Sequence, residues 1–231
     1  MKVFITAIIV AFATVLLVSA NAVLSKMAWT IHENAFINGI LKYQLYAFSI
    51  AFLVALLTLI MHPESKVLWT FGAVETVAVK EKWLGINGKS SWKTNGLQLL
   101  FFISCATALF MFLGVKYTNS LGNFKPYFIP FILLVSLSNS LSEELIYRFA
   151  IHGNLMNIAP KMTVLLMSAV LFGIPHFYGF PSGVIGIIMA GMLGYVLSKV
   201  TYETQGLGMA WGIHFVQDII IFTALFMMNV K

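Results

Sequence analysis

Long apolar runs alternate with short polar connections along the chain. Three of the runs, each 18 or 19 residues long, contain no Asp, Glu, Lys, Arg or His: Val3–Ala20, Tyr43–Met61 and Leu97–Val115. A helix needs about 20 mainly apolar residues to cross the roughly 30 Å of hydrocarbon in a bilayer. Each of these runs therefore predicts one membrane-spanning helix.

Four more apolar runs follow, and three of them are interrupted by charged or histidine residues. The four runs are Pro126–Asn157, Met162–Phe180, Gly183–Ser198 and Gly208–Val230. The third is rich in glycine, and small residues let neighbouring membrane helices approach closely. The chain is thus predicted to span the membrane seven times. A shorter apolar stretch, residues 67–79, contains Glu75, which favours a position at the membrane interface and leaves an eighth span as the alternative.

The composition agrees with an all-α polytopic membrane protein that forms a single membrane domain over residues 1–231. Hydrophobic residues make up 60% of the chain and charged residues only 10%, whereas a soluble domain has about 25% charged residues. Residues 1–96 would hold the first spans and a polar connection, and residues 97–231 a helical core that contains the candidate site residues. The single cysteine, Cys105, excludes an internal disulfide and a cysteine-based zinc site.

The lysines indicate how the chain is oriented. The largest polar connection, His62–Gly96, holds five lysines, and cytoplasmic loops of membrane proteins carry such an excess. This predicts a cytoplasmic N-terminus and an external C-terminus. The net charge of +6 comes from lysines beside the spans and not from a dense basic patch, which argues against a nucleic-acid partner. Short loops and the lack of a targeting signal favour a bacterial plasma membrane.

The N-terminus allows two interpretations. Lys2, the apolar run and the small residues at 19–22 resemble a cleavable secretory signal. The run is longer than the core of a usual signal, so we expect an uncleaved first span.

Six charged or histidine residues in the last apolar runs are candidates for a functional site. They are Glu143, Glu144, Arg148, His176, His214 and Asp218. A charged side chain near the centre of a membrane helix costs about 2.5–3.5 kcal/mol on insertion scales, and such residues usually face the bundle interior and pair with one another. The residues therefore predict a polar site inside the bundle.

Helical spacing divides the first group into two parts. Glu144 and Arg148 are four residues apart with the glutamate first, which is the favoured order for an ion pair. Glu143 is rotated about 100° away on the same helix and has no cationic partner there. A carboxylate in this setting suits a general base.

Residue counting from the nearest turns estimates the depth of each group. At about 1.5 Å per residue, Glu143 lies about 20 Å and His176 about 24 Å from the turn at residues 157–160. His214 comes out at about 10–15 Å on the same scale, one or two turns short. Asp218 follows it on the same helical face, and Phe172 precedes His176 by one turn and could wall the site. Three helices can therefore bring the four candidate residues to one cavity.

Three motifs connect these residues to a known family. Glu143–Arg148 has the form EExxxR, Phe172–His176 the form FxxxH and His214–Asp218 the form HxxxD. In this order on separate membrane helices, they resemble the CAAX-protease and bacteriocin-processing (CPBP) family, which includes the type II CAAX prenyl endopeptidases. The resemblance covers about residues 97–228.

The resemblance implies hydrolysis of a peptide bond within the membrane. Glu143 would activate the attacking water, His176 would help to hold it, and His214 with residue 218 would stabilise the oxyanion. Many family members have Asn at the last position, whereas this chain has Asp218. An ionised Asp cannot donate a hydrogen bond. Asp218 must therefore be protonated, orient a protonated His214, or bind a metal ion.

The cofactor is a second open point. Glu143, His176, His214 and Asp218 are suitable zinc ligands, although the HExxH spacing of common zinc proteases is absent. The family was first classed as metalloproteases, and a glutamate mechanism without metal is also argued for it. We favour the glutamate mechanism.

Two other functions compete with a protease that cuts a membrane-associated peptide or protein. A non-catalytic scaffold or immunity protein could keep the fold, but it has no need for costly polar groups. A cation-coupled transporter would also use intramembrane carboxylates and histidines, but it predicts inverted repeats, and none is visible. The substrate, its lipidation, its side of entry and the oligomeric state cannot be read from the sequence.

Overall fold

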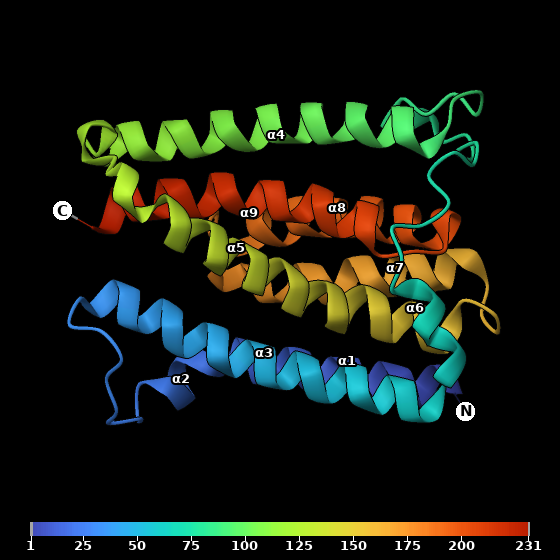
Figure 1. Cartoon of the computed structure of the whole chain (residues 1–231), viewed down its shortest axis with the longest axis horizontal. Coiled ribbons are helices and arrows are strands. Elements are labelled where there is room, and N and C mark those ends of the chain that lie inside the picture. The colour runs from blue at the N-terminus through green and yellow to red at the C-terminus, as the bar shows by residue number, and fades with distance from the viewer. Residues whose placement is uncertain (1, 231) are drawn as a thin grey trace.

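The computed structural model describes residues 2–230, which form helices joined by short connections (Figure 1). The α-helices are α1 (Lys2–Val18), α2 (Ala20–Leu24), α3 (Ala35–Met61), α4 (Trp92–Tyr117), α5 (Ile129–Glu144), α6 (Ala150–Leu155), α7 (Lys161–Gly173), α8 (Gly183–Thr204) and α9 (Gly208–Asn229). Short 3₁₀ helices are η1 (Pro63–Leu68), η2 (Lys82–Leu84), η3 (Leu121–Asn123), η4 (Pro126–Phe128) and η6 (Ile174–Tyr178), and η5 (Leu145–Phe149) is a π-helix. Within this part of the chain, β pairing is limited to two isolated bridges.

The predicted spans are present as helices. Six helical segments are long and apolar enough to cross a membrane: 35–61, 92–117, 126–155, 161–178, 183–204 and 208–229. The first predicted span is the shorter α1, whose 17 residues reach about 25 Å. The alternative of an eighth span at residues 67–79 is wrong, because the chain there leaves η1 and continues through turns and a β-bridge.

The helices lie side by side along the longest axis of the molecule (Figure 1). Helices α1 and α3 form one side, α4 forms the other, and α5, α7, α8 and α9 lie between them. The N-terminus lies at the same end as the connection 62–91, and the C-terminus lies at the opposite end. This is the arrangement that an odd number of crossings requires. Helix α5 runs obliquely to α4 and α9.

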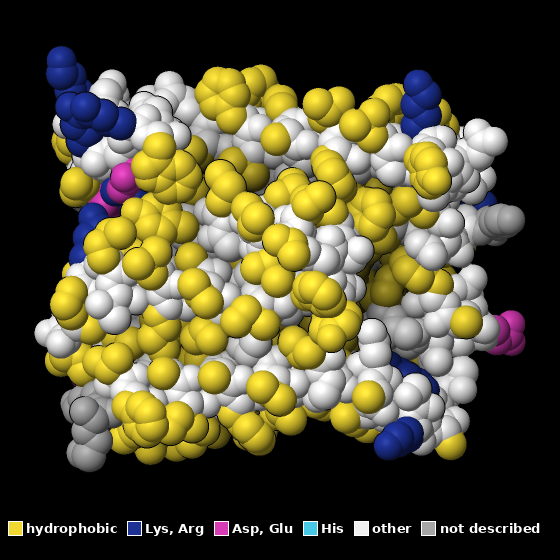
Figure 2. Space-filling model, turned by 180° about the vertical axis from the view of Figure 1, so that it is seen from behind, with side chains coloured by type: hydrophobic (Ala, Val, Ile, Leu, Met, Phe, Trp, Pro, Cys, Tyr) yellow, Lys and Arg dark blue, Asp and Glu magenta, His cyan; other side chains and the backbone are white. Residues whose placement is uncertain are grey.

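The surface of the bundle is apolar. Phenylalanine and isoleucine side chains such as Phe4, Ile60 and Phe102 are 68–70% exposed. Hydrophobic side chains cover the middle of the face seen in Figure 2, and the lysines lie toward its two ends. Such a surface would be unfavourable in water and fits the hydrocarbon of a bilayer. The chain is an integral membrane protein.

Small residues bring α7 and α8 into close contact beside the site. A Cβ on Gly173 would clash with the backbone of Ile187, and one on Gly194 would lie 3.0 Å from the Phe172 ring. This agrees with the role predicted for the glycine-rich run. As a result, Phe172 is completely buried. Its ring provides a packing surface between the helices that carry the ionisable groups.

Candidate active site

His214 lies at the centre of the buried polar cluster. Its Nδ1 is 2.8 Å from Oε1 of Glu144, and its Nε2 is 3.3 Å from Oε2 of Glu143. The ring is buried and packs edge-on against Phe172, with 5.4 Å between the ring centroids. Both nitrogens of one imidazole therefore face carboxylates from α5.

These contacts correct the depth obtained by residue counting. His214 is level with both glutamates, not one or two turns short of them. The rise of 1.5 Å per residue measures distance along a helix axis, and α5 runs obliquely to α9 (Figure 1). Because α5 is tilted, each of its residues adds less than about 1.5 Å along the axis of the bundle.

Glu144 has two partners where the sequence suggested one. The predicted ion pair with Arg148 is present, with 3.4 Å between Nε and Oε2. The contact with His214 is shorter. The Arg148 guanidinium is fully buried and stacks on the Phe172 ring, with Cζ 4.2 Å from the ring centroid. Phe172 thus supports both Arg148 and His214.

A π-helical turn connects the glutamates to Arg148. Residues Leu145–Phe149 have π-helical hydrogen bonding between α5 and α6, and all five side chains are buried. Single π turns within α-helices are common at functional sites. This one widens the helix directly after the two glutamates. The spacing of four residues between Glu144 and Arg148 predicts a regular α-helix here, and the structure has a π-helical turn instead.

Asp218 lies one turn after His214 and joins the same cluster. Its Oδ1 is 3.8 Å from Nε2 of His214, and its Oδ2 accepts a hydrogen bond from Nδ2 of Asn139 at 3.1 Å. The same Asn139 nitrogen is 3.4 Å from Oε1 of Glu143. Asn139 is not among the site residues predicted from the sequence, although it lies four residues before Glu143 and thus on the same helical face.

His176 approaches from η6, the 3₁₀ turn that follows α7. Its ring Nδ1 is 2.8 Å from the carbonyl oxygen of Phe172, so Nδ1 is the donor and Nε2 is left as an acceptor. The ring packs on Phe172 with 4.8 Å between centroids. The rings of His176 and His214 thus both pack against Phe172.

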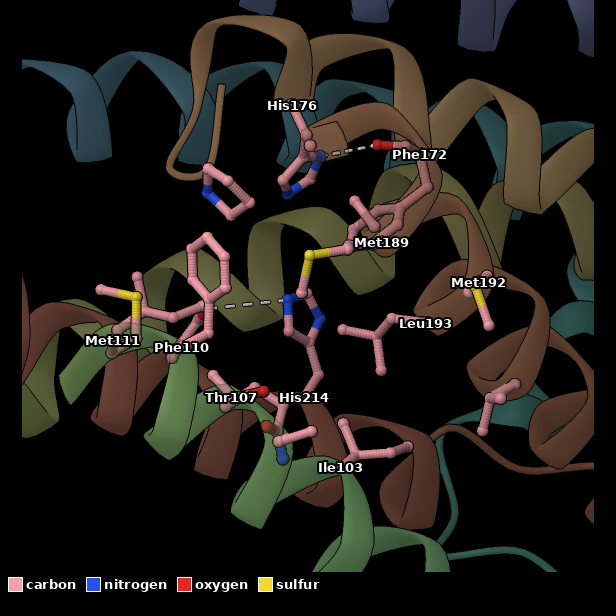
Figure 3. A pocket seen from close by; sticks show the side chains of 18 of the residues that line it. Ile103, Thr107, Phe110, Met111, Phe172, His176, Met189, Met192, Leu193 and His214 are labelled. Carbon is pink, nitrogen blue, oxygen red and sulfur yellow. Dashed lines mark hydrogen bonds and ion pairs between the residues drawn. The ribbon is translucent and has the colours of Figure 1, made fainter. Parts of the chain in front are cut away.

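Two cavities meet at these residues. The first, about 310 Å³, is almost wholly apolar and is shown in Figure 3. His176, His214 and Asp218 line it, together with Met189, Leu193 and Phe110 from the surrounding helices. In Figure 3 both histidine rings project into this space.

The second cavity, about 490 Å³, lies on the α1–α3 side of the cluster and has a more polar lining. Glu143 and His176 both line it, with Tyr43, Gln44 and Gly39 of α3. The Glu143 side chain is 13% exposed, against 1% for Glu144. Of the two adjacent glutamates, Glu143 is therefore the one that an incoming molecule can reach.

The described residues do not form a preorganised metal centre. Among residues 2–230, no group of three or more His, Cys, Asp or Glu side chains is placed to hold a metal ion. Both nitrogens of His214 already face carboxylates. Among the described residues, Glu143, His176, His214 and Asp218 are thus not gathered into such a group.

Fold and site together define a polytopic membrane protein whose polar cluster lies inside a helical bundle. Residues 125–220 match the family model described as type II CAAX prenyl endopeptidase Rce1-like. The match covers less than half of the chain and contains all three motifs, which confirms the predicted resemblance. Over this segment the chain is similar to that family. Comparisons with curated proteins and with solved structures gave no match.

Proposed function

We propose that the protein is an intramembrane endopeptidase that cuts a membrane-associated peptide or protein, with Glu143 as the general base. The main supporting observation is the position of Glu143. It lies between His214 and a cavity that it shares with His176. The family match supports the reaction class, because it covers the segment that contains every proposed site residue.

Water is activated by Glu143 and His176. Nε2 of His176 is free to accept a hydrogen bond from the water because Nδ1 donates to Phe172. Glu143 removes one proton as the water oxygen bonds to the carbonyl carbon of the substrate, and the carbonyl π electrons move to oxygen. The C–N bond then breaks, and the same proton passes from Glu143 to the leaving amine.

His214 stabilises the oxyanion. With a carboxylate beside each nitrogen, the ring fits the imidazolium form, in which both nitrogens donate. Glu144 holds Nδ1 and Arg148 balances its charge, so that Nε2 is directed toward the reacting carbonyl. Of the three roles considered for Asp218, this arrangement favours the second, in which the carboxylate orients a protonated His214. No metal ion is required for any of these steps.

The apolar cavity accommodates the hydrophobic part of the substrate. Its lining is almost entirely aliphatic, aromatic and methionine side chains. A peptide already held in the bilayer can enter such a space without desolvation of polar groups. We place the N-terminus and the lysine-rich connection on the cytoplasmic side of a plasma membrane, because both lie at one end of the bundle.

The decisive test compares the peptides of cells that carry wild-type protein with those of cells that carry E143Q. The amide retains the shape of the side chain but cannot act as base, and loss of a general base lowers the rate by about 10²–10⁴-fold. We expect at least one peptide to accumulate uncut in E143Q cells. Equal membrane levels and equal gel-filtration profiles of the two proteins are the control.

Unchanged peptide cleavage by E143Q would refute the role of Glu143. The scaffold alternative makes the opposite prediction for the cellular phenotype. A scaffold keeps its phenotype in the E143A variant, whereas a protease loses it.

A further inference from the structure

Asn139 connects three helices at the site. On α5 it lies one turn before Glu143, and its Nδ2 is 3.1 Å from Asp218 of α9 and 3.4 Å from Glu143. Its Oδ1 accepts a hydrogen bond from Nε2 of Gln44 on α3 at 3.2 Å. Gln44 and Asp218 are buried, so the contacts lie inside the bundle.

The chemistry of the partners permits only one orientation of the Asn139 amide. An amide group has two N–H donors at one end and an acceptor oxygen at the other. The nitrogen faces two carboxylate oxygens, and the oxygen faces the NH₂ of Gln44. If the amide were reversed, oxygen would face oxygen and NH₂ would face NH₂. The two carboxylates thus set the direction in which Asn139 donates, and Gln44 supports it from the other end of the amide.

The carboxylates of Glu143 and Asp218 need such a donor. Both lie beside Nε2 of His214, at 3.3 and 3.8 Å, and two carboxylates in one buried site repel each other. The two N–H groups of Asn139 lie on the other side of the pair. They offset this repulsion and fix the direction in which each carboxylate points.

We propose that Asn139 is a positioning residue that holds Asp218 as a hydrogen-bond acceptor and keeps Glu143 directed at the water, and that Gln44 orients Asn139. The inference rests on the proposed function, because it acts through Glu143. The role of Asn139 also explains why position 218 can be an aspartate. Because Asn139 already provides the amide donor that faces Glu143, residue 218 can provide a carboxylate.

An exchange of the two side chains tests the pair. In N139D, a third carboxylate faces Glu143 and Asp218. We expect kcat to fall by about 100-fold, as for a misplaced catalytic group, with KM unchanged. In N139D/D218N, the amide at 218 donates to the carboxylate at 139, and Gln44 still donates to it. We expect the double variant to recover about 10-fold in kcat over N139D, which is within the range of coupling between contacting residues.

Gln44 provides a second variant that leaves α5 and α9 intact. In Q44E the side chain keeps its shape but loses the donor that orients Asn139. We expect kcat to fall by about 10-fold without a change in KM. The matched control is N154D. Asn154 is a buried amide on α6 that donates to Ala150 and Thr58 and contacts no site residue, so kcat of its folded fraction should stay at the wild-type value.

All rates are measured in detergent on gel-filtered protein, with a synthetic fluorescence-quenched form of the peptide that accumulates uncut in E143Q cells. Wild-type kcat in N139D or Q44E, or a double variant no faster than N139D, would overturn the positioning role. If N139D does not fold, Q44E decides. Activity of E143Q on the same peptide would instead refute the proposed function.

Discussion

Two buried clusters of charged residues differ in how completely they are satisfied. One is the candidate site around His214. The other is the anchor cluster near the end of α8, formed by Lys199, Glu203 and Lys161. Lys199 is 1% exposed and Glu203 6%, so each cluster contains charged groups that have been removed from water at a cost.

The anchor cluster uses all its acceptors. Oε1 of Glu203 accepts from Nζ of Lys161 and of Lys199, each at 2.6 Å. Oε2 accepts from the backbone N–H of Val79 at 2.8 Å and from Nε1 of Trp92 at 3.0 Å. One carboxylate therefore fastens the connection between α3 and α4 to α7 and α8.

The site cluster leaves hydrogen-bonding capacity unused. Among the described residues, Oε2 of Glu143 and Oε2 of Glu144 are buried without a donor of normal geometry, and all three Arg148 nitrogens are buried without an acceptor of normal geometry. Their nearest opposite charges are at ion-pair distances of 3.3 and 3.4 Å. Groups that are fully bonded stabilise a fold, whereas incompletely bonded groups remain available for a reaction. This is the difference we expect between a structural cluster and the reactive one that we propose.

The largest effect is expected at Arg148. R148A leaves the carboxylates of Glu143, Glu144 and Asp218 with His214 alone among their ion-pair partners in the described chain, and removal of one partner of a buried pair typically costs about 3–5 kcal/mol of stability. It also removes the guanidinium that stacks on Phe172. We expect little folded protein, measured by gel filtration and by unfolding in SDS.

The double variant E144Q/R148M separates stability from catalysis. Removal of both charges should restore folded protein relative to R148A. Activity should remain low, because His214 has lost the carboxylate at Nδ1. Full activity in the double variant would contradict the orienting role of Glu144.

A smaller effect, confined to stability, is expected in the anchor cluster. K199M removes one of four donors to Glu203, and a hydrogen bond to a charged group contributes about 1.5–3 kcal/mol. The free energy of unfolding should fall by that amount, while kcat of the folded fraction stays constant. K89M, at an exposed position in the same connection, is the control and should change neither quantity. A large loss of kcat in K199M would mean that the two clusters are coupled.

Metal removal should have the smallest effect. The site offers no group of three preorganised ligands among residues 2–230, so protein dialysed against a chelator should keep its activity. The metal content of the same sample is measured by mass spectrometry. If activity is lost and then returns with added Zn²⁺, the glutamate mechanism is wrong.

The sequence predicts the helical fold and the motif residues well because both depend on local patterns. Apolar run length determines which segments become spans, and costly ionisable residues identify the interior faces. Asn139 lacks such a signal, because an uncharged amide in a serine-rich helix is ordinary. Only its spacing of four residues from Glu143 could have drawn attention to it. Gln44 could not have been found, since its role depends on how α3 packs against α5.

The anchor cluster and the π-helical turn show a second limit. Lys199 and Glu203 are four residues apart, like Glu144 and Arg148, but here the basic residue comes first. Nothing in the sequence indicates that Val79 and Trp92 also donate hydrogen bonds to Glu203. The π turn at residues 145–149 requires the helix to take in one extra residue per turn, and tertiary packing decides where that occurs.

The connection between α3 and α4 also reaches the apolar cavity, where Trp83 and Leu84 form part of the wall. The Trp83 ring packs against Tyr195 of α8 at 5.3 Å between centroids. These two wall residues come from a segment that contains none of the three motifs. In the protease that we propose, selectivity and reactivity can therefore vary independently. Exchange of this connection between related proteins offers a way to change which peptides are accepted while the proton-handling groups stay the same.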